Sequence, residues 1–314
     1  MLCILKILKG ACPIMKITCH DVFSVLKERE RDSNKGTYGT LTIVAGSKYF
    51  RGSAALAAEG ALRSGCGIVR VASTERVIGS VSSKLSECIY LPLEENESGS
   101  ISSVSADELI SVSEKSSAML IGCGMTQHND TACIVKRLVL NADCPLVLDA
   151  DALNVLKGDA DVLRRAKHPV IITPHVGEMA RLCGDILPDM SGVEISEIKA
   201  IKADAGKAAL DFSTKYNCIT VLKDYITYIA YSGRKTAFNE NGNPGLARGG
   251  SGDVLAGIIS SFLSQGIDPF SAAKCGVWLH AEAADRCAAE KSQYGMLPSD
   301  IFPYIQRIFS ENGR

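Results

Sequence analysis

A glycine-rich stretch over residues 241–257 has the composition of an anion-binding loop. Gly249, Gly250 and Gly252 allow the backbone to approach a ligand closely, and an apolar helical pattern follows at once. The first turn of such a helix offers unpaired N–H groups and the positive end of a dipole, which together bind phosphate. Asp253 is the one acid in this turn, where it is either a general base or an ordinary N-terminal helix charge.

Polar residues follow several predicted strands at the point where each strand ends. Asp149 and Asp151 follow one strand, His175 and Glu178 follow the next, and Lys223 ends a third. Because ligands of open α/β sheets bind outside the carboxyl ends of the strands, we expect these side chains to share one edge with the glycine loop. Taken singly, each is equally compatible with a turn, a helix cap or a satisfied loop histidine.

The elements that must position these residues alternate between strand and helix. Strands are expected over residues 40–45, 67–71, 88–91, 118–124, 145–151, 170–173, 218–222, 226–230 and 235–239. Helices are expected over residues 52–63, 76–85, 130–140, 196–215, 253–264, 270–291 and 298–309, with an exposed polar loop over 94–103. This alternation predicts an α/β fold with a central, mostly parallel sheet and helices on both faces.

Composition limits the domain count and the class of partner. The 314 residues, 46% of them apolar, predict an N-terminal extension over residues 1–20, with Met15 as a second candidate start, and a single domain over 21–314. A net charge of −1 without a basic block excludes a nucleic-acid partner, and the first nine residues are too short to span a bilayer. Twelve cysteines, without a C-x-x-C pair, indicate reduced thiols of a cytoplasmic protein.

Several common catalytic motifs do not occur in the sequence. It has no G-x-x-x-x-G-K-[ST] phosphate loop and no G-x-G-x-x-G followed by an acid about twenty residues later. It also has no G-x-S-x-G hydrolase elbow and no H-E-x-x-H zinc helix. The glycine loop therefore belongs to a phosphate-binding class other than the Walker and standard dinucleotide types.

The ordered motifs at residues 41–46, 61–67, 148–154, 173–178, 222–223 and 249–257 resemble the ADP/ATP-dependent NAD(P)H-hydrate dehydratase family. The resemblance spans about residues 35–309 and implies a ribokinase-like fold. It implies a stand-alone lyase of cofactor repair, in which the 6S hydrate of NADH or NADPH (NADHX or NADPHX) loses water while a nucleotide is cleaved. ADP cleaved to AMP is expected in preference to ATP cleaved to ADP. The resemblance further implies Mg²⁺ and a homo-oligomer, with a tetramer as one candidate.

The resemblance also implies site residues. Contacts with the hydrated cofactor are expected from Ala54, Gly124, His175 and Asp253, of which Asp253 is the expected catalytic base. The adenine nucleotide is expected at Lys223, Asp224, Tyr225, Ile226, Thr227 and Gly252. The phosphate or metal environment is expected to be ordered by Asn154 and Glu178 and by the loop residues Gly250 and Ser251. No residue is assigned as a metal ligand.

Three positions depart from the family pattern. Asp224 stands where glycine is usual, Cys123 stands where proline is common between Gly122 and Gly124, and Arg248 stands where a small or hydroxyl residue is frequent. Two alternatives remain open. One is a ribokinase-like small-molecule kinase, acting on a sugar, a hydroxymethylpyrimidine or a thiazole alcohol, against which the motifs at 149–154 and 173–178 argue. The other is a nucleotide-binding sensor without turnover, which would gain nothing from an acid beside a phosphate.

Overall fold

The computed structural model describes residues 14–183 and 194–314. Ten strands form one sheet in the order β1-β10-β9-β8-β7-β6-β5-β2-β3-β4. Their bounds are β1 (Ile14–Lys16), β2 (Thr40–Val44), β3 (Ile68–Thr74), β4 (Ile89–Leu93), β5 (Ala118–Ile121), β6 (Leu146–Leu148), β7 (Val170–Ile172), β8 (Ile219–Leu222), β9 (Thr227–Ala230) and β10 (Thr236–Asn239). In the series β8-β7-β6-β5-β2-β3-β4 each strand pairs in parallel with the next, and β9 runs antiparallel to both of its neighbours. The predicted α/β class with a mostly parallel sheet is confirmed.

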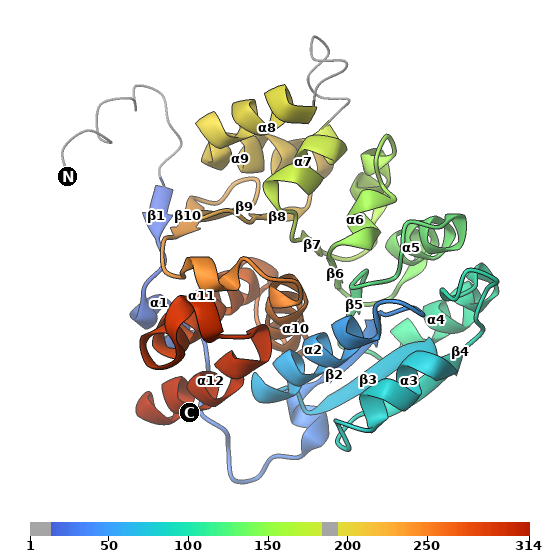
Figure 1. Cartoon of the computed structure of the whole chain (residues 1–314), viewed down its shortest axis with the longest axis horizontal. Helices are drawn as coiled ribbons and strands as arrows, with labels where there is room; N and C mark the ends of the chain where they lie inside the picture. Colours follow the sequence, from blue (N-terminus) through green and yellow to red (C-terminus); the bar gives the residue numbers. More distant parts are fainter. Residues whose placement is uncertain (1–13, 184–193) are drawn as a thin grey trace.

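Helices cover both faces of the sheet. One face carries α1 (Cys19–Phe23), α2 (Arg51–Arg63), α3 (Glu75–Ser82), α10 (Ser251–Ser264), α11 (Pro269–Gly295) and α12 (Phe302–Glu311). The other carries α4 (Ala106–Ser113), α5 (Asn129–Asn141), α6 (Asp151–Asn154), α7 (Val176–Cys183), α8 (Glu194–Ala203) and α9 (Ala205–Tyr216). Figure 1 shows α2, α10, α11 and α12 on one side of the sheet and α5 to α9 on the other.

The strand sequences explain why two separate cores form. Successive residues of a strand point to opposite faces, so Leu120 packs in the core of α2 and α10 whereas Met119 and Ile121 pack in that of α4 and α5. Both sets are fully buried, which is why the parallel strands are almost continuously apolar. The sheet is thereby held rigid from both sides.

Small residues bring α10 unusually close to α2. A Cβ atom on Gly257 would lie 2.1 Å from the carbonyl oxygen of Ala57, and one on Gly60 would lie 2.9 Å from that of Val254. Real side chains do not tolerate such distances, so glycine is required at Gly257 for the two backbones to meet. These contacts hold the first two turns of α10, which carry Asp253, against the middle of α2.

The structure corrects several expected elements. The helix expected over 196–215 is two helices, because Asp204 leaves helical geometry (φ −149°, ψ 70°) and its side chain caps α9 by accepting from the Lys207 N–H. Sequence periodicity missed α4, α6 and α7, which are short. Within the loop expected to be exposed, Ser100 and Ile101 are buried, since Ile101 forms a bridge with Glu95.

Part of the expected N-terminal extension belongs to the sheet. Residues 1–13 lie outside the described residues, but β1 pairs in parallel with β10 and α1 begins at Cys19. The buried side chain of Val22 on α1 joins the core on the α10 face. Among the helices of 14–183 and 194–314, we find none with the length and apolarity needed to cross a membrane.

Candidate functional site

A cavity of about 790 Å³ opens at the carboxyl ends of β6, β7 and β8, beside the first turn of α10. Its walls include Asp149, His175, Glu178, Lys223 and Asp253, the side chains expected to meet at one edge of the sheet. Of the residues expected to bind ligand, the walls also include Asp224, Tyr225, Thr227, Gly250, Ser251 and Gly252. The parallel β6 to β8 ladder brings these distant segments together.

An ion pair lies at the base of the cavity. The Lys223 ammonium is 2.8 Å from Asp149 Oδ1, and the Thr173 hydroxyl donates to the same oxygen at 2.6 Å. Burial works to lower the pKa of Lys223, but the carboxylates of Asp149 and Glu178 outweigh it and raise that pKa above its ordinary value. Asp149 is only 2% exposed, so Lys223 supplies the positive charge that a buried carboxylate needs.

His175 and Glu178 cap the start of α7. The N–H groups of Gly177 and Glu178 donate to His175 Nδ1 at 3.0 and 3.2 Å, and Glu178 Oε2 accepts from the His175 N–H at 2.8 Å. Because Nδ1 accepts, the neutral ring carries its proton on Nε2, which lies 3.6 Å from Glu178 Oε1. Burial, then the Lys223 charge, lowers the pKa of His175, while burial raises that of Glu178.

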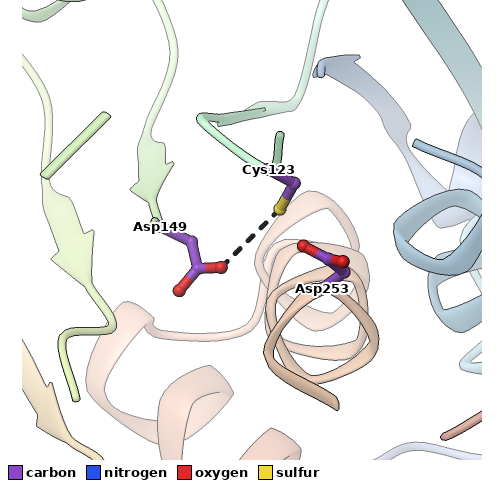
Figure 2. A group of neighbouring side chains, drawn as sticks. All are labelled: Cys123, Asp149 and Asp253. Carbon is purple, nitrogen blue, oxygen red and sulfur yellow. Dashed lines mark hydrogen bonds between the residues drawn. The ribbon is translucent and has the colours of Figure 1, made fainter. Parts of the chain in front are cut away.

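Asp253 occupies the third position of α10. Burial first and the nearby Asp149 carboxylate second raise its pKa from 3.8 to about 6, against hydrogen bonds from Ser53 and Cys123 that lower it. Figure 2 shows Asp253 facing Asp149, with the Cys123 thiol beside both carboxylates. A carboxylate with a pKa near 6 is a stronger base than an ordinary aspartate and is still ionised at neutral pH.

The amino end of α10 is arranged to receive an anion. Gly250 precedes the helix at φ +100°. Because glycine has no side chain, it cannot cap the first amides of the helix. The positive φ disfavours any other residue at Gly250, whereas the Leu56 methyl group, 2.5 Å from a Cβ placed there, could move aside. A Cβ atom on Gly252 would lie 3.4 Å from Lys223 Nζ. The helix amides and the Lys223 ammonium therefore face one small volume, where a phosphate would be bound.

Three buried polar atoms on the walls lack a hydrogen-bond partner. They are Asn239 Oδ1, Ser251 Oγ and His280 Nε2. Burial lowers the pKa of His280 to about 4, so its ring is neutral at physiological pH. Unpaired buried polar groups are costly, and a ligand that supplies N–H or O–H groups would satisfy them. The sequence analysis did not select Asn239 or His280. Asn239 ends β10, so the rule that ligands bind at the carboxyl ends of strands could have selected it. His280 lies within an expected helix, where that rule does not apply.

Four of the expected site residues do not line this cavity. Ala54 of α2 is fully buried, Asn154 accepts from Arg181 Nε at 3.0 Å, and Ile226 and Gly124 also lie off the walls. A Cβ atom on Gly124 would lie 2.9 Å from the Ser53 hydroxyl, the group that hydrogen bonds to Asp253. Gly124 thus lies beside Ser53 of α2, next to Asp253.

The departures from the family pattern have identifiable contacts. The Asp224 carboxylate pairs with Lys202 at 3.4 Å, and Tyr225 is 83% exposed at the cavity rim. Arg248 also lines the cavity, and its guanidinium donates to the carbonyl of Tyr294. Arg248 is therefore held by α11 and does not simply point into solvent.

The donor atoms around Asp253 do not fit a resident Mg²⁺ ion. Cys123, Asp149 and Asp253 each offer one atom within 4.8 Å of the others. Mg²⁺ prefers oxygen ligands, and one of these three donors is sulfur. The Lys223 ammonium already neutralises Asp149. We therefore derive no catalytic step from a metal held by these side chains.

A model of the NAD(P)H-hydrate dehydratase family matches residues 41–307, most of the chain. The chain belongs to the NAD(P)H-hydrate dehydratase family. The ADP-dependent (S)-NAD(P)H-hydrate dehydratase of Neisseria meningitidis is 37% identical over 89% of this chain and 88% of that protein. The bifunctional NAD(P)H-hydrate repair enzyme of Moorella thermoacetica is 35% identical over 92% of this chain and 53% of its own length.

The chain therefore spans about half the length of the bifunctional members of the NAD(P)H-hydrate dehydratase family that it matches. Among solved structures, the ADP/ATP-dependent NAD(P)H-hydrate dehydratase of Bacillus subtilis, co-crystallised with ATP and Mg²⁺, superposes with a TM-score of 0.78 at 30% identity. That superposition covers 96% of this chain and 99% of the other. The expected ribokinase-like arrangement of this family is confirmed.

Proposed function

We propose that this protein dehydrates the 6S hydrate of NADH or NADPH back to the reduced cofactor, with cleavage of ADP to AMP and phosphate. The observation that carries the proposal is the position of Asp253. Its carboxylate hydrogen bonds to Ser53 of α2, which lies beside Gly124, and it lines the cavity together with Lys223 and the start of α10. A base between two ligands is what phosphoryl transfer from a nucleotide to a substrate hydroxyl requires.

The chemistry proceeds in two steps. The C6 hydroxyl oxygen attacks the terminal phosphorus of the nucleotide, Asp253 accepts the hydroxyl proton, and the bond to the AMP leaving group breaks. The C6–O bond then breaks with loss of phosphate, and a proton lost from C5 restores the ring double bond. Lys223 and the amides of Gly250 to Gly252 stabilise the charge on the transferred phosphoryl group. The elimination therefore expels phosphate in place of hydroxide, and hydroxide is a much poorer leaving group than phosphate.

The adenosine end of the nucleotide accounts for the unpaired polar atoms. In the neutral ring of His280, the hydrogen bond with the Ser251 backbone occupies the other nitrogen, so Nε2 is an acceptor. Asn239 Oδ1 is a second acceptor, since the Asn239 amide nitrogen already donates to the carbonyl of Asn241 at 3.0 Å. Ribose hydroxyls or the adenine amino group provide donors of the matching kind.

Further features complete the proposal. Mg²⁺ arrives with the nucleotide phosphates and is not a resident ion. His175 and Asp253 contact the hydrated cofactor, Lys223, Asp224, Tyr225, Thr227 and Gly252 contact the nucleotide, and Glu178, Gly250 and Ser251 order the phosphates. The fold from β1 onward acts as one catalytic domain of a cytoplasmic homo-oligomer. The free state of all ten cysteines among the described residues supports a reducing compartment.

A spectroscopic assay tests the proposed function. Purified protein is mixed with hydrated NADH, Mg²⁺ and either ADP or ATP, and the return of the dihydronicotinamide absorbance is followed. Return of the absorbance with ADP supports the proposal, and faster return with ATP would reverse the expected nucleotide preference. No return with either nucleotide would contradict it. Phosphorylation of a sugar, hydroxymethylpyrimidine or thiazole alcohol instead would favour the kinase alternative.

A further inference from the structure

Cys123 lies in a loop whose backbone is fixed by neighbouring strands. The loop follows β5, and the Cys123 carbonyl accepts from the Gly46 N–H at 2.8 Å. A Cβ atom on Gly122 would lie 1.9 Å from the carbonyl oxygen of Asp149, so this segment packs directly on the residue that ends β6. These backbone contacts with the sheet therefore fix the position of Cys123 beside the site.

The thiol lies against both carboxylates of the site (Figure 2). Its sulfur is 3.7 Å from Asp149 Oδ2, within reach of an S–H donor, and the nearest Asp253 oxygen lies within 4.8 Å of both groups. Asp149 uses its other oxygen, Oδ1, to accept from Lys223 and Thr173. Cys123 thus contacts the one Asp149 oxygen that faces Asp253.

We propose that Cys123 is a positioning residue, whose single thiol proton lies beside the facing oxygens of Asp149 and Asp253, donates to one or the other, and so reduces the repulsion between the two carboxylates. The inference rests on the proposed role of Asp253 as the base. Two carboxylates this close disfavour each other's ionised form unless donors lie between or beside them. Burial raises the pKa of the Cys123 thiol well above its ordinary value, so the thiol keeps its proton and can only donate.

The other groups around Asp253 have different roles. Lys223 at the end of β8 is the nearest cation, Asp149 at the end of β6 is the nearest anion, and Ser53 on α2 donates a hydrogen bond. Glu178 of the α7 cap acts on Lys223, and the Lys223 charge acts on His175. His280 of α11 is neutral. Cys123 is the group that contacts both acids, so its removal is expected to raise the pKa of Asp253.

The test measures the pKa of Asp253 directly, by carbon NMR of protein labelled at its aspartate carboxyls. The resonance is assigned by its loss in the Asp253→Asn variant. In Cys123→Ala the pKa of Asp253 should rise by about half a unit to one unit, because a hydrogen bond to its charged form is removed. In Cys123→Ser, which restores a donor, it should return close to the wild-type value.

Cys218→Ala is the matched control, because Cys218 is equally buried but contacts Thr220 away from the cavity. It should leave the pKa of Asp253 unchanged. An unchanged pKa in Cys123→Ala, or an equal rise in Cys218→Ala, would overturn the inference. If the pKa rises as expected, the acid limb of the dehydration rate should move by the same amount in Cys123→Ala. A raised pKa in a protein without dehydratase turnover supports the inference and contradicts only the proposed function.

Discussion

Asp253→Asn is expected to make the protein more stable while it removes catalysis. The pKa of Asp253 rises from 3.8 to about 6 in the folded protein. Each pKa unit corresponds to about 1.4 kcal/mol, so the ionised carboxylate costs the folded state up to roughly 3 kcal/mol. The folded state binds this proton more tightly than the unfolded chain, so the cost is fully present above about pH 6 and disappears below about pH 4.

Urea unfolding followed by circular dichroism measures this cost. At about pH 8 we expect Asp253→Asn to raise the free energy of unfolding by about 1 to 3 kcal/mol, and at about pH 4 by much less. Asp107→Asn serves as the control, since Asp107 is an exposed partner of Arg137 and its loss should change stability by about 0.5 kcal/mol or less at either pH. A variant that is less stable than wild type at the higher pH would refute the reasoning.

The same variant tests the base assignment. We expect turnover to fall by about 10² to 10⁴-fold, the usual contribution of a general base, with little change in nucleotide affinity. In the wild type, the rate should fall as the pH drops through about 6, because a protonated Asp253 cannot accept the hydroxyl proton. Titration calorimetry with ADP and a pH–rate profile measure the two effects. An Asp253→Asn enzyme with full activity would remove this residue from the base role.

Three other substitutions follow from the structure. Lys223→Met should destabilise the fold by about 3 to 5 kcal/mol, because Asp149 is left buried without its counter-charge; urea unfolding should show that Asp149→Asn in the same chain recovers much of the loss. His280→Leu should raise the KM for the nucleotide by about fivefold with little change in kcat, since one hydrogen bond is worth about 1 kcal/mol; an unchanged KM would show that His280 does not contact the nucleotide. Gly257→Ala should lower the free energy of unfolding by about 1 to 3 kcal/mol, because the added methyl group clashes with Ala57 on α2, and the melting temperature should fall accordingly. Gly266→Ala is the control: a Cβ there meets no neighbour within 4 Å, so with φ +80° only backbone strain is expected.

The positions of residues at strand ends predicted the site more accurately than apolar periodicity predicted where helices and strands begin and end. Asp149, His175, Glu178 and Lys223 could be placed together because parallel strands end at one edge, which depends only on strand order and direction. The same rule also placed Asp151 at the ligand-binding edge, and this was wrong: its carboxylate accepts from the Thr126 N–H, and Asp151 does not line the cavity. Which of two adjacent acids faces the ligand depends on backbone turns, here the left-handed Ala150 between them (φ 51°), that sequence periodicity does not reveal.

Other features required the three-dimensional structure. The pattern of apolar residues continues from α8 into α9, so a helix break at Asp204 was not visible in it. The contact of the Cys123 thiol with two acids depends on the pairing of β5 with β2 and β6, and His280 reaches the cavity only because α11 packs beside α10. Such contacts between distant segments decide the pKa of the base, and composition and spacing carry no signal for them.

The most direct test of the central claim is the stoichiometry of the reaction. Hydrated NADH, Mg²⁺ and limiting ADP are incubated with the enzyme, and NADH, AMP and phosphate are each quantified by chromatography. Coupled phosphoryl transfer should give one NADH and one phosphate for each AMP, and Asp253→Asn should form all three about 10² to 10⁴-fold more slowly. AMP formed without NADH, or NADH formed without nucleotide cleavage, would contradict the coupling of phosphoryl transfer to dehydration.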